Sequence, residues 1–371
     1  MSKARRPAKH PASAKPRDLL ESHLRALAAD EGWPLDRPLP TTRELAKEFG
    51  PSAATVFRLL QQLEAEGVLW QHTSGRFHRA AARALLDRPK PVACLIRRLE
   101  LCSALYRELL EGISAGTGAT RRAMLLWHDD VLVNHADPDR PPTFASAAAQ
   151  RVVLDSFLER HGADAGGFVL DHVWADAVLK RAAAAPGKKL SPGVLLFRRA
   201  PEDANLANVR ADFDAAATQA LAHLLGRGFT RLVPVEPFGG DPAVDEFFSA
   251  LTRAASSLGC AGRVAPLARG HQPADRSALI ASLPRKERVA LIVPEDHVAV
   301  RLRAEIAAAG RACPESAGLL AVMGTDVAGA AGLSRLSFDF RAMGRAAIEM
   351  LAEGATRRTV FTPTLQAGET T

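Results

Sequence analysis

Residues 39–67, with the sequence LPTTRELAKEFGPSAATVFRLLQQLEAEG, decide the fold of the first part of the chain. Apolar residues recur at spacings of three and four on both sides of Gly50-Pro51, which predicts two short amphipathic helices joined by a tight turn. Thr41 or Thr42 stands where the first helix needs an N-cap, and Ser52 holds the same place for the second. Two helices in such close succession predict a helix-turn-helix.

The flanking segments complete a small domain. Before the two helices, the apolar spacing of residues 17–28 predicts a further amphipathic helix. After them, residues 68–71 and 76–78 surround a turn that contains Gly75, a pattern typical of a β-hairpin. Because a hairpin in this position is a wing, we predict a winged helix-turn-helix domain at residues 17–80.

Positive charge is concentrated in the first quarter of the chain. Residues 1–90 hold 16 Lys and Arg against 10 Asp and Glu, a balance of +6, whereas residues 91–371 hold 32 against 31, a balance of +1. Such an excess favours a polyanion as partner, because lysines and arginines that neutralise phosphates release counterions. We also expect a basic, disordered tail at residues 1–16 and an Ala- and Arg-rich linker at residues 81–91.

The composition argues against several classes of protein. With 47% apolar residues in 371, the chain can bury a sizeable core, yet it has no apolar run of eighteen, so we expect no membrane segment and a cytoplasmic location. The four cysteines lack zinc-ligand spacing, and we expect no metal site. Neither His128-Asp129-Asp130 with His135 nor any other polar group has a recognised catalytic spacing, so we expect no enzyme, no catalytic residues and no cofactor.

Residues 92–371 alternate between short apolar runs and helical periodicity. Strands are predicted at residues 92–96, 124–127, 167–170, 194–197, 231–235, 289–293 and 319–323. Helices are predicted at residues 105–114, 152–159, 216–225, 244–258 and 298–308. This alternation predicts an α/β fold in which parallel sheets carry helices on both faces, and the length suits two doubly wound lobes with a ligand cleft between them.

The first domain resembles the gluconate-repressor (GntR) type of winged helix-turn-helix. The resemblance is carried by Leu39–Ala46, by Ser52 with Thr55-Val56, by Leu63–Leu69 and by the wing glycine Gly75. It implies DNA contacts from Thr42, Arg43, Ser52, Thr55, Arg58, Gly75 and Arg76. Physical chemistry agrees, because the free N–H groups of a helix N-terminus bind phosphate and an arginine can bind guanine through two hydrogen bonds.

Two positions depart from that family. Ala53 and Phe57 stand where the family commonly has arginine, so two usual contacts are absent and Arg58 replaces only part of them. This departure implies a weaker or an altered sequence specificity. The alternative, a winged helix that contacts only protein, would leave Arg43, Arg58 and Arg76 without a role.

The large domain is similar to the regulatory domain of the lactose-repressor (LacI/GalR) family, which itself resembles periplasmic sugar-binding proteins. The matching segments are residues 193–197, 209–212, 220–232, 296–310, 324–326 and 336–347. A winged helix ahead of such a domain resembles the arabinose-repressor architecture. The similarity implies an effector between the lobes, held by Asp171, Arg198, Arg199, Glu295, Asp296, Asp326 and Phe340, with Trp174 as a further candidate. Carboxylates suit polyols because each accepts several hydrogen bonds.

This domain, too, departs from its family. Residues 243–246 replace a motif that usually supplies a sugar-binding arginine, and Glu295 stands where asparagine is frequent. A cationic, amino or otherwise unusual ligand, or no ligand, therefore remains open. Glu295 and Asp296 could also serve only as caps of the helix that follows.

Together these patterns predict a transcription regulator that binds a double-stranded DNA operator as a homodimer assembled through its large domains. The resemblance favours repression, controlled by a sugar-like small molecule. The alternative is a DNA-binding regulator that needs no ligand and whose large domain only dimerises.

Overall fold

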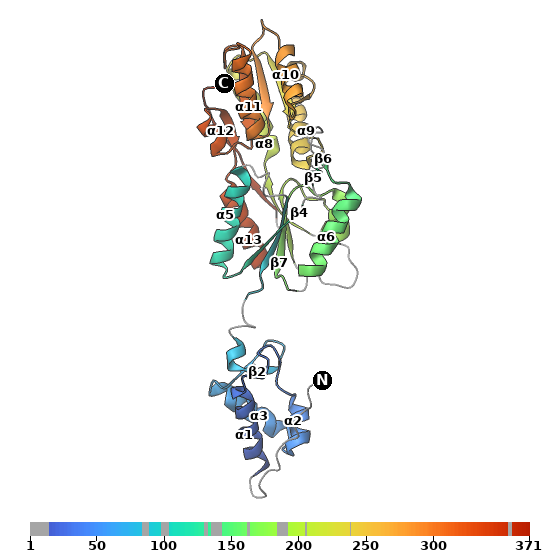
Figure 1. Cartoon of the computed structure of the whole chain (residues 1–371), viewed down its shortest axis with the longest axis vertical. Coiled ribbons are helices and arrows are strands. Elements are labelled where there is room, and N and C mark those ends of the chain that lie inside the picture. Colours follow the sequence, from blue (N-terminus) through green and yellow to red (C-terminus); the bar gives the residue numbers. More distant parts are fainter. Residues whose placement is uncertain are drawn as a thin grey trace. The chain divides into compact units, whose positions relative to one another are not determined.

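The computed structural model describes residues 15–83, 89–97, 104–129, 133–134, 143–161, 164–183, 192–204, 206–237, 239–354 and 358–371. The chain forms two compact units, Met1–Pro89 and Lys90–Thr371, each with its own core (Figure 1). Most of the predicted tail and residues 84–88 of the predicted linker lie outside the described residues. In the described part, no helix combines the length and apolar character needed to cross a bilayer.

Three helices and a β-hairpin make up the first unit. In chain order they are α1 (Pro16–Ala29), α2 (Thr42–Phe49), α3 (Ala53–Ala65), β1 (Leu69–Gln71) and β2 (Phe77–Arg79), followed by the 3-10 turn η1 (Ala80–Ala82). The two strands pair antiparallel. Leucines from all three helices, such as Leu24, Leu45 and Leu59, are buried together in its core.

Capping residues determine where α2 and α3 begin. Thr41 and Glu44 form a capping box, in which the Glu44 amide donates to the Thr41 hydroxyl and the Glu44 carboxylate accepts from the Thr41 amide at 2.6 Å. Ser52 caps α3 by accepting from the Thr55 amide at 3.2 Å. Gly50 ends α2 with φ +89°, a conformation that glycine adopts without strain.

The first lobe of the second unit is a six-stranded parallel sheet covered by helices on both faces. Its strands are β3 (Val92–Arg97), β4 (Met124–Asp129), β7 (Gly167–Leu170), β8 (Gly193–Phe197), β9 (Ala207–Ala211) and β15 (Arg358–Phe361), in the order β15-β9-β8-β7-β3-β4. One face carries α5 (Ala104–Ala119) and α13 (Phe340–Glu353), and the other carries α6 (Ala147–His161) and α7 (Asp176–Ala183) (Figure 1). A short antiparallel pair, β5 (Val133–Asn134) and β6 (Thr143–Phe144), accompanies it.

The second lobe repeats this plan. Its strands are β10 (Arg231–Glu236), β11 (Ala268–Arg269), β12 (Val289–Val293), β13 (Ala317–Val322), β14 (Ser334–Ser337) and β16 (Thr364–Gln366), in the order β11-β10-β12-β13-β14-β16, with only β16 antiparallel. The helices are α8 (Phe213–Gly226) and α9 (Pro242–Ser257) on one face, α10 (Pro273–Ser282) and α11 (Asp296–Ala308) on the other, and the short α12 (Asp326–Ala330) and η4 (Ala261–Arg263). The prediction of an α/β fold with two doubly wound lobes is confirmed.

The chain passes between the two lobes three times. It enters the second lobe after β9, returns to the first lobe with α13, and leaves again between β15 and β16. The loops that follow β7 and β8 contact the beginning of α9, which follows β10. Loops at the carboxyl ends of parallel strands from both lobes therefore meet at the junction, where doubly wound folds commonly bind ligands.

Helices α5 and α13 pack unusually closely because glycines face each other. A Cβ atom at Gly344 would lie 2.3 Å from the carbonyl oxygen of Leu109, and one at Gly112 would lie 2.0 Å from that of Arg341. Neither position has room for a side chain, so the two glycines set the spacing of these helices.

Candidate functional site

The predicted DNA-contacting residues lie on α2, on α3 and in the hairpin turn. They are Thr42 and Arg43 at the start of α2, Ser52, Thr55 and Arg58 at the start of α3, and Gly75 and Arg76 in the turn between β1 and β2. All three arginines are exposed. Ser52 and Thr55 already bond to each other, with 2.9 Å between their hydroxyl oxygens.

The three arginines differ in their contacts. Arg76 donates to the Leu39 carbonyl at 3.3 Å, and Arg58 donates to the Ala54 carbonyl one turn earlier at 3.4 Å. Arg43 makes no hydrogen bond or ion pair with any residue that the structure describes. Its guanidinium is therefore available to a partner.

Phe57, at a position where the resembling family has arginine, supports the hairpin. Its ring is 39% exposed and meets the ring of Phe77 in β2 edge-on, with 6.2 Å between centroids. Ala53 is exposed at the first position of α3. Helix α3 thus makes an aromatic contact with the hairpin.

At the junction of the lobes, His172 lies between two carboxylates. Its Nδ1 is 2.6 Å from Asp171 Oδ1, and its Nε2 is 3.1 Å from Asp241 Oδ2. Asp171 and His172 follow β7 in the first lobe, whereas Asp241 is the N-cap of α9 in the second. We call these three residues the histidine bridge; all are buried, and Asp171 is 0% exposed.

Arg198 is held rigidly beside the bridge. It donates to the carbonyl oxygen of His172 at 3.0 Å, to Asp176 Oδ1 at 2.7 Å and to the carbonyl of Trp174. The guanidinium is buried and its donors are used to fix the loop after β7. Arg198 therefore supports this edge of the first lobe instead of offering a free charge.

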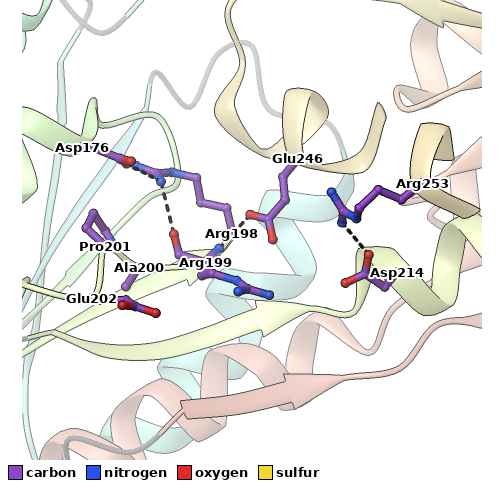
Figure 2. A pocket seen from close by; sticks show the side chains of 9 residues that line it. All are labelled: Asp176, Arg198, Arg199, Ala200, Pro201, Glu202, Asp214, Glu246 and Arg253. Atoms are coloured by element: carbon purple, nitrogen blue, oxygen red, sulfur yellow. Dashed lines mark hydrogen bonds and ion pairs between the residues drawn. The ribbon is translucent and has the colours of Figure 1, made fainter. Parts of the chain in front are cut away.

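A pocket of about 510 Å³ opens next to Arg198 and is lined by both lobes (Figure 2). The first lobe contributes Asp176 and residues 198–202, and the second contributes Asp214, Glu246 and Arg253. Arg253 pairs with Asp214 at 2.5 Å, and Glu246 accepts from the Arg199 amide at 2.8 Å. The pocket wall is strongly polar and carries both signs of charge.

Arg199 is the predicted ligand residue that remains unengaged in this pocket. Its side chain is exposed and points from the loop after β8 towards the Asp214–Arg253 pair (Figure 2). Its guanidinium makes no hydrogen bond or ion pair within the described part of the chain. An anionic or strongly polar group of a ligand would find its donors free.

The predicted residues of the second lobe have other partners. Asp296 is buried, and its Oδ2 accepts from the amide and the hydroxyl of Thr325 at 2.9 and 2.5 Å. Burial raises the pKa of Asp296, and the hydrogen bonds from Thr325 offset part of that rise. Glu295 caps α11 by accepting from the His297 amide at 3.4 Å, and Asp326 is exposed and pairs with Arg335 at 3.5 Å.

Phe340 belongs to an aromatic cluster in the protein interior. It is 1% exposed, and its ring centroid lies 6.1 Å from that of Phe197, which meets the ring of His172 edge-on at 5.1 Å. Trp174 is buried as well. Phe340 and Trp174 are therefore interior residues and do not belong to the lining of the pocket beside Arg198 and Arg199.

Of the seven predicted ligand residues, Arg198 and Arg199 line the pocket, and Asp171 belongs to the adjacent bridge. His172 and Asp241 were not among the predicted residues. His172 directly follows a residue at the carboxyl end of a strand, and Asp241 precedes Pro242, a usual helix start, so both carried local signals. Nothing local indicated that the two side chains would meet.

Comparisons with known proteins agree with this architecture. Residues 221–371 match the model of a periplasmic binding protein-like domain. The structure is similar to a LacI transcriptional regulator from a Rhodococcus species (17% identity, TM-score 0.59, covering 76% of this chain and 98% of that one). It is also similar to the Escherichia coli transcriptional repressor ascG (17% identity, TM-score 0.57, 76% and 99% covered).

A third similar structure contains a sugar. It is a LacI family transcriptional regulator from Weissella paramesenteroides with bound sucrose, at 14% identity and a TM-score of 0.60, with 76% of this chain and 98% of that chain covered. Among curated protein sequences, none matches the chain. The second unit thus has the two-lobed periplasmic-binding-protein-like fold found in structures of LacI-family regulators.

Proposed function

We propose that the chain is a cytoplasmic DNA-binding transcription regulator, acting as a repressor, whose second unit responds to a small molecule bound between its lobes. The observation that carries the proposal is the combination of a periplasmic-binding-protein-like unit with a separate helical unit that presents exposed arginines. When a DNA-binding unit is joined to a unit that binds a small molecule, the small molecule can change the affinity for DNA, and DNA can change the affinity for the small molecule.

DNA binding is assigned to the first unit as a winged helix-turn-helix of the GntR type. Helix α3 would enter the major groove with its N-terminal residues Ser52 and Thr55, while Arg43 contacts a base or phosphate. The exposed, unpaired guanidinium of Arg43 supports this assignment. A homodimer would present two copies of α3 to a roughly palindromic operator.

The effector is assigned to the pocket beside Arg199. Solved neighbours with sucrose, glucose or D-xylulofuranose support a sugar or a related metabolite. The free guanidinium of Arg199 and the mixed charges of the pocket wall favour a sugar derivative that carries an ionised group. The histidine bridge favours a second candidate, a regulator that needs no ligand, because the chain's own side chain already joins the lobes.

Protection of operator DNA tests the first part of the proposal. The full-length protein should protect a site near the promoter of its own gene at low salt, and Arg43→Ala should weaken specific binding by about 1–3 kcal/mol, the value of one bidentate base contact. Arg263→Ala, an equal loss of charge on the exposed η4 turn of the second unit, is the matched control and should bind like wild type. Absence of protection by the wild type would overturn DNA regulation.

A thermal-shift screen of sugars, sugar acids and sugar phosphates tests the second part. A compound that binds in the pocket should raise the melting temperature of the wild type, because binding only to the folded state stabilises it. Arg199→Ala should remove that shift, whereas Arg263→Ala should retain it. If no compound shifts the wild type, the regulator without a ligand becomes the better description.

A further inference from the structure

The histidine bridge links the loop after β7 in the first lobe to α9 in the second, and Arg210 of β9 and Glu246 of α9 form a longer ion pair between the lobes at 3.9 Å. Both carboxylates are anchored within their own lobes. Asp171 Oδ2 accepts from the Tyr106 hydroxyl at 2.8 Å, and Asp241 Oδ1 accepts from the amides of Ala243 and Val244 at 2.9 and 3.3 Å. Asp241 Oδ2 is hydrogen-bonded to His172 Nε2, whereas Asp171 Oδ1 accepts from the His172 amide at 2.7 Å and makes an ion-pair contact with Nδ1 that lacks hydrogen-bond geometry. The ring therefore connects two groups that are each fixed to a different lobe.

The surroundings of the ring hold it in this position. Phe197 lies edge-on to it, and the His172 carbonyl accepts from Arg198 at 3.0 Å. Phe197 has φ +68°, a conformation that costs a non-glycine residue energy and that the surrounding structure must enforce. Such an enforced backbone conformation beside the bridge is typical of a functional position.

The two carboxylates require a positive charge between them. Burial alone would lower the pKa of His172, but Asp241 and Asp171 outweigh burial and raise it to about 9. Farther along α9 lies Asp245, whose own pKa is raised by burial and then by Asp241. Arg198 is the cation beside these groups, and it is already bound to Asp176 and to carbonyl oxygens. Imidazolium is therefore the form of His172 that balances the site at neutral pH.

We propose that the His172 imidazolium is an internal ligand that holds the two lobes together by bridging Asp171 and Asp241. Loss of its proton releases Asp241 and allows the lobes to separate. The inference deepens the proposed function, on which it rests for its biological meaning, because separation of the lobes is the motion that an effector would control. A regulator of this kind has a closed form that requires no small molecule.

The bridge makes closure depend on pH with a defined sign. In the closed form the pKa of His172 is about 9, and in the separated form His172 keeps Asp171 but loses Asp241, so its pKa is lower. Closure is then fully favoured while His172 is protonated in both forms and is lost as pH rises through 9. Between the two pKa values the closure constant should fall by about tenfold per pH unit.

Spin-label distances in the full-length protein test the proposal directly. Val152→Cys on α6 and Leu258→Cys after α9 place labels at positions that are 69% and 51% exposed, one in each lobe. Cys102→Ser and Cys313→Ser leave only Cys94 and Cys260, which are buried. Pulsed electron spin resonance then measures the distance between the labels, in protein diluted with unlabelled copies, from pH 6 to pH 10.

We expect a single short distance at pH 6. A second, longer distance should appear at higher pH, and the fraction of molecules that show it should grow as pH approaches 9. Asp241→Asn keeps a side-chain cap for α9 but removes the charge, so the longer distance should already appear at pH 7. His172→Gln should make the distance distribution independent of pH. Asp339→Asn, the same change at the N-cap of α13 outside the bridge, is the matched control and should follow the wild type.

One short distance from pH 6 to pH 10 in the wild type would overturn the proposal, as would Asp241→Asn with the distances and pH dependence of the wild type. The wild-type profile requires no substitution at the bridge, so a variant that fails to fold leaves the test intact. Label distances need neither DNA nor an effector. Failure of the bridge is therefore distinguishable from failure of operator protection, which bears on the proposed function.

Discussion

At the scale of single residues, Asp296 shows how a carboxylate nominated for ligand binding can be engaged by the protein itself. Its Oδ2 is bound to Thr325, and its Oδ1 is buried without a hydrogen-bond partner in the described part of the chain. A buried oxygen of this kind is costly while the group is ionised, because no donor replaces the lost water. The raised pKa of Asp296 expresses the same cost.

Asp296→Asn should therefore stabilise the protein at pH 7. The amide keeps an acceptor for the Thr325 amide and removes the buried charge. Because the folded-state pKa of Asp296 is raised, its ionisation destabilises the fold above that pKa and has no effect below the ordinary value of 3.8. The gain in unfolding free energy from Asp296→Asn should accordingly shrink as pH falls from 7 towards 4. Urea unfolding of both proteins at several pH values measures it.

Asp203→Asn provides the comparison, since the side chain of Asp203 is 62% exposed. Its unfolding free energy should stay close to that of the wild type across the same pH range. A loss of stability for Asp296→Asn at pH 7 would contradict the argument and indicate that the negative charge itself is needed there.

At the scale of elements, the close packing of helices α5 and α13 predicts that even a methyl group does not fit between them. Gly344→Ala would put a methyl group 2.3 Å from the Leu109 carbonyl oxygen, so the helices must separate. We expect a loss of about 1–3 kcal/mol in unfolding free energy, the usual cost of overpacking. Urea denaturation of the full chain, followed by circular dichroism, measures it.

Gly118→Ala is the control within α5, because a Cβ atom there has nothing within 4 Å. It should gain about 0.5–1 kcal/mol from the better helix propensity of alanine. Equal effects of the two substitutions would show that helix propensity, not the spacing of α5 and α13, governs these positions.

Elements also show how far the sequence could predict the structure. Strands β7 and β12 have the predicted bounds because every residue in them is apolar or glycine and every one is buried. Strands β9 and β14 were not predicted, since ANVRA and SRLS mix polar with apolar residues and resemble loops. The contact of His172 with Asp241 joins residues 69 positions apart and depends on the packing of two lobes, which no local pattern encodes.

At the scale of the whole molecule, the uneven charge predicts how the proposed DNA binding responds to salt. The first 90 residues carry the balance of +6, and each neutralised phosphate contributes about −0.9 to the slope of log K against log salt. For a dimer that neutralises about six phosphates, affinity should fall about 10³-fold between 50 and 200 mM salt. Fluorescence anisotropy with labelled operator DNA measures the slope, and a slope near zero would argue against phosphate contacts by this unit.

The three passages of the chain between the lobes affect the order in which the protein can fold during synthesis. The first lobe begins at β3, but α13 and β15, which cover and extend its sheet, come from residues 340–361. The sheet face that α13 covers therefore stays incompletely covered until residues 340–353 have left the ribosome, whereas the first unit is complete much earlier. Nascent chains that have left the ribosome only through β9 should expose apolar surface and need a chaperone.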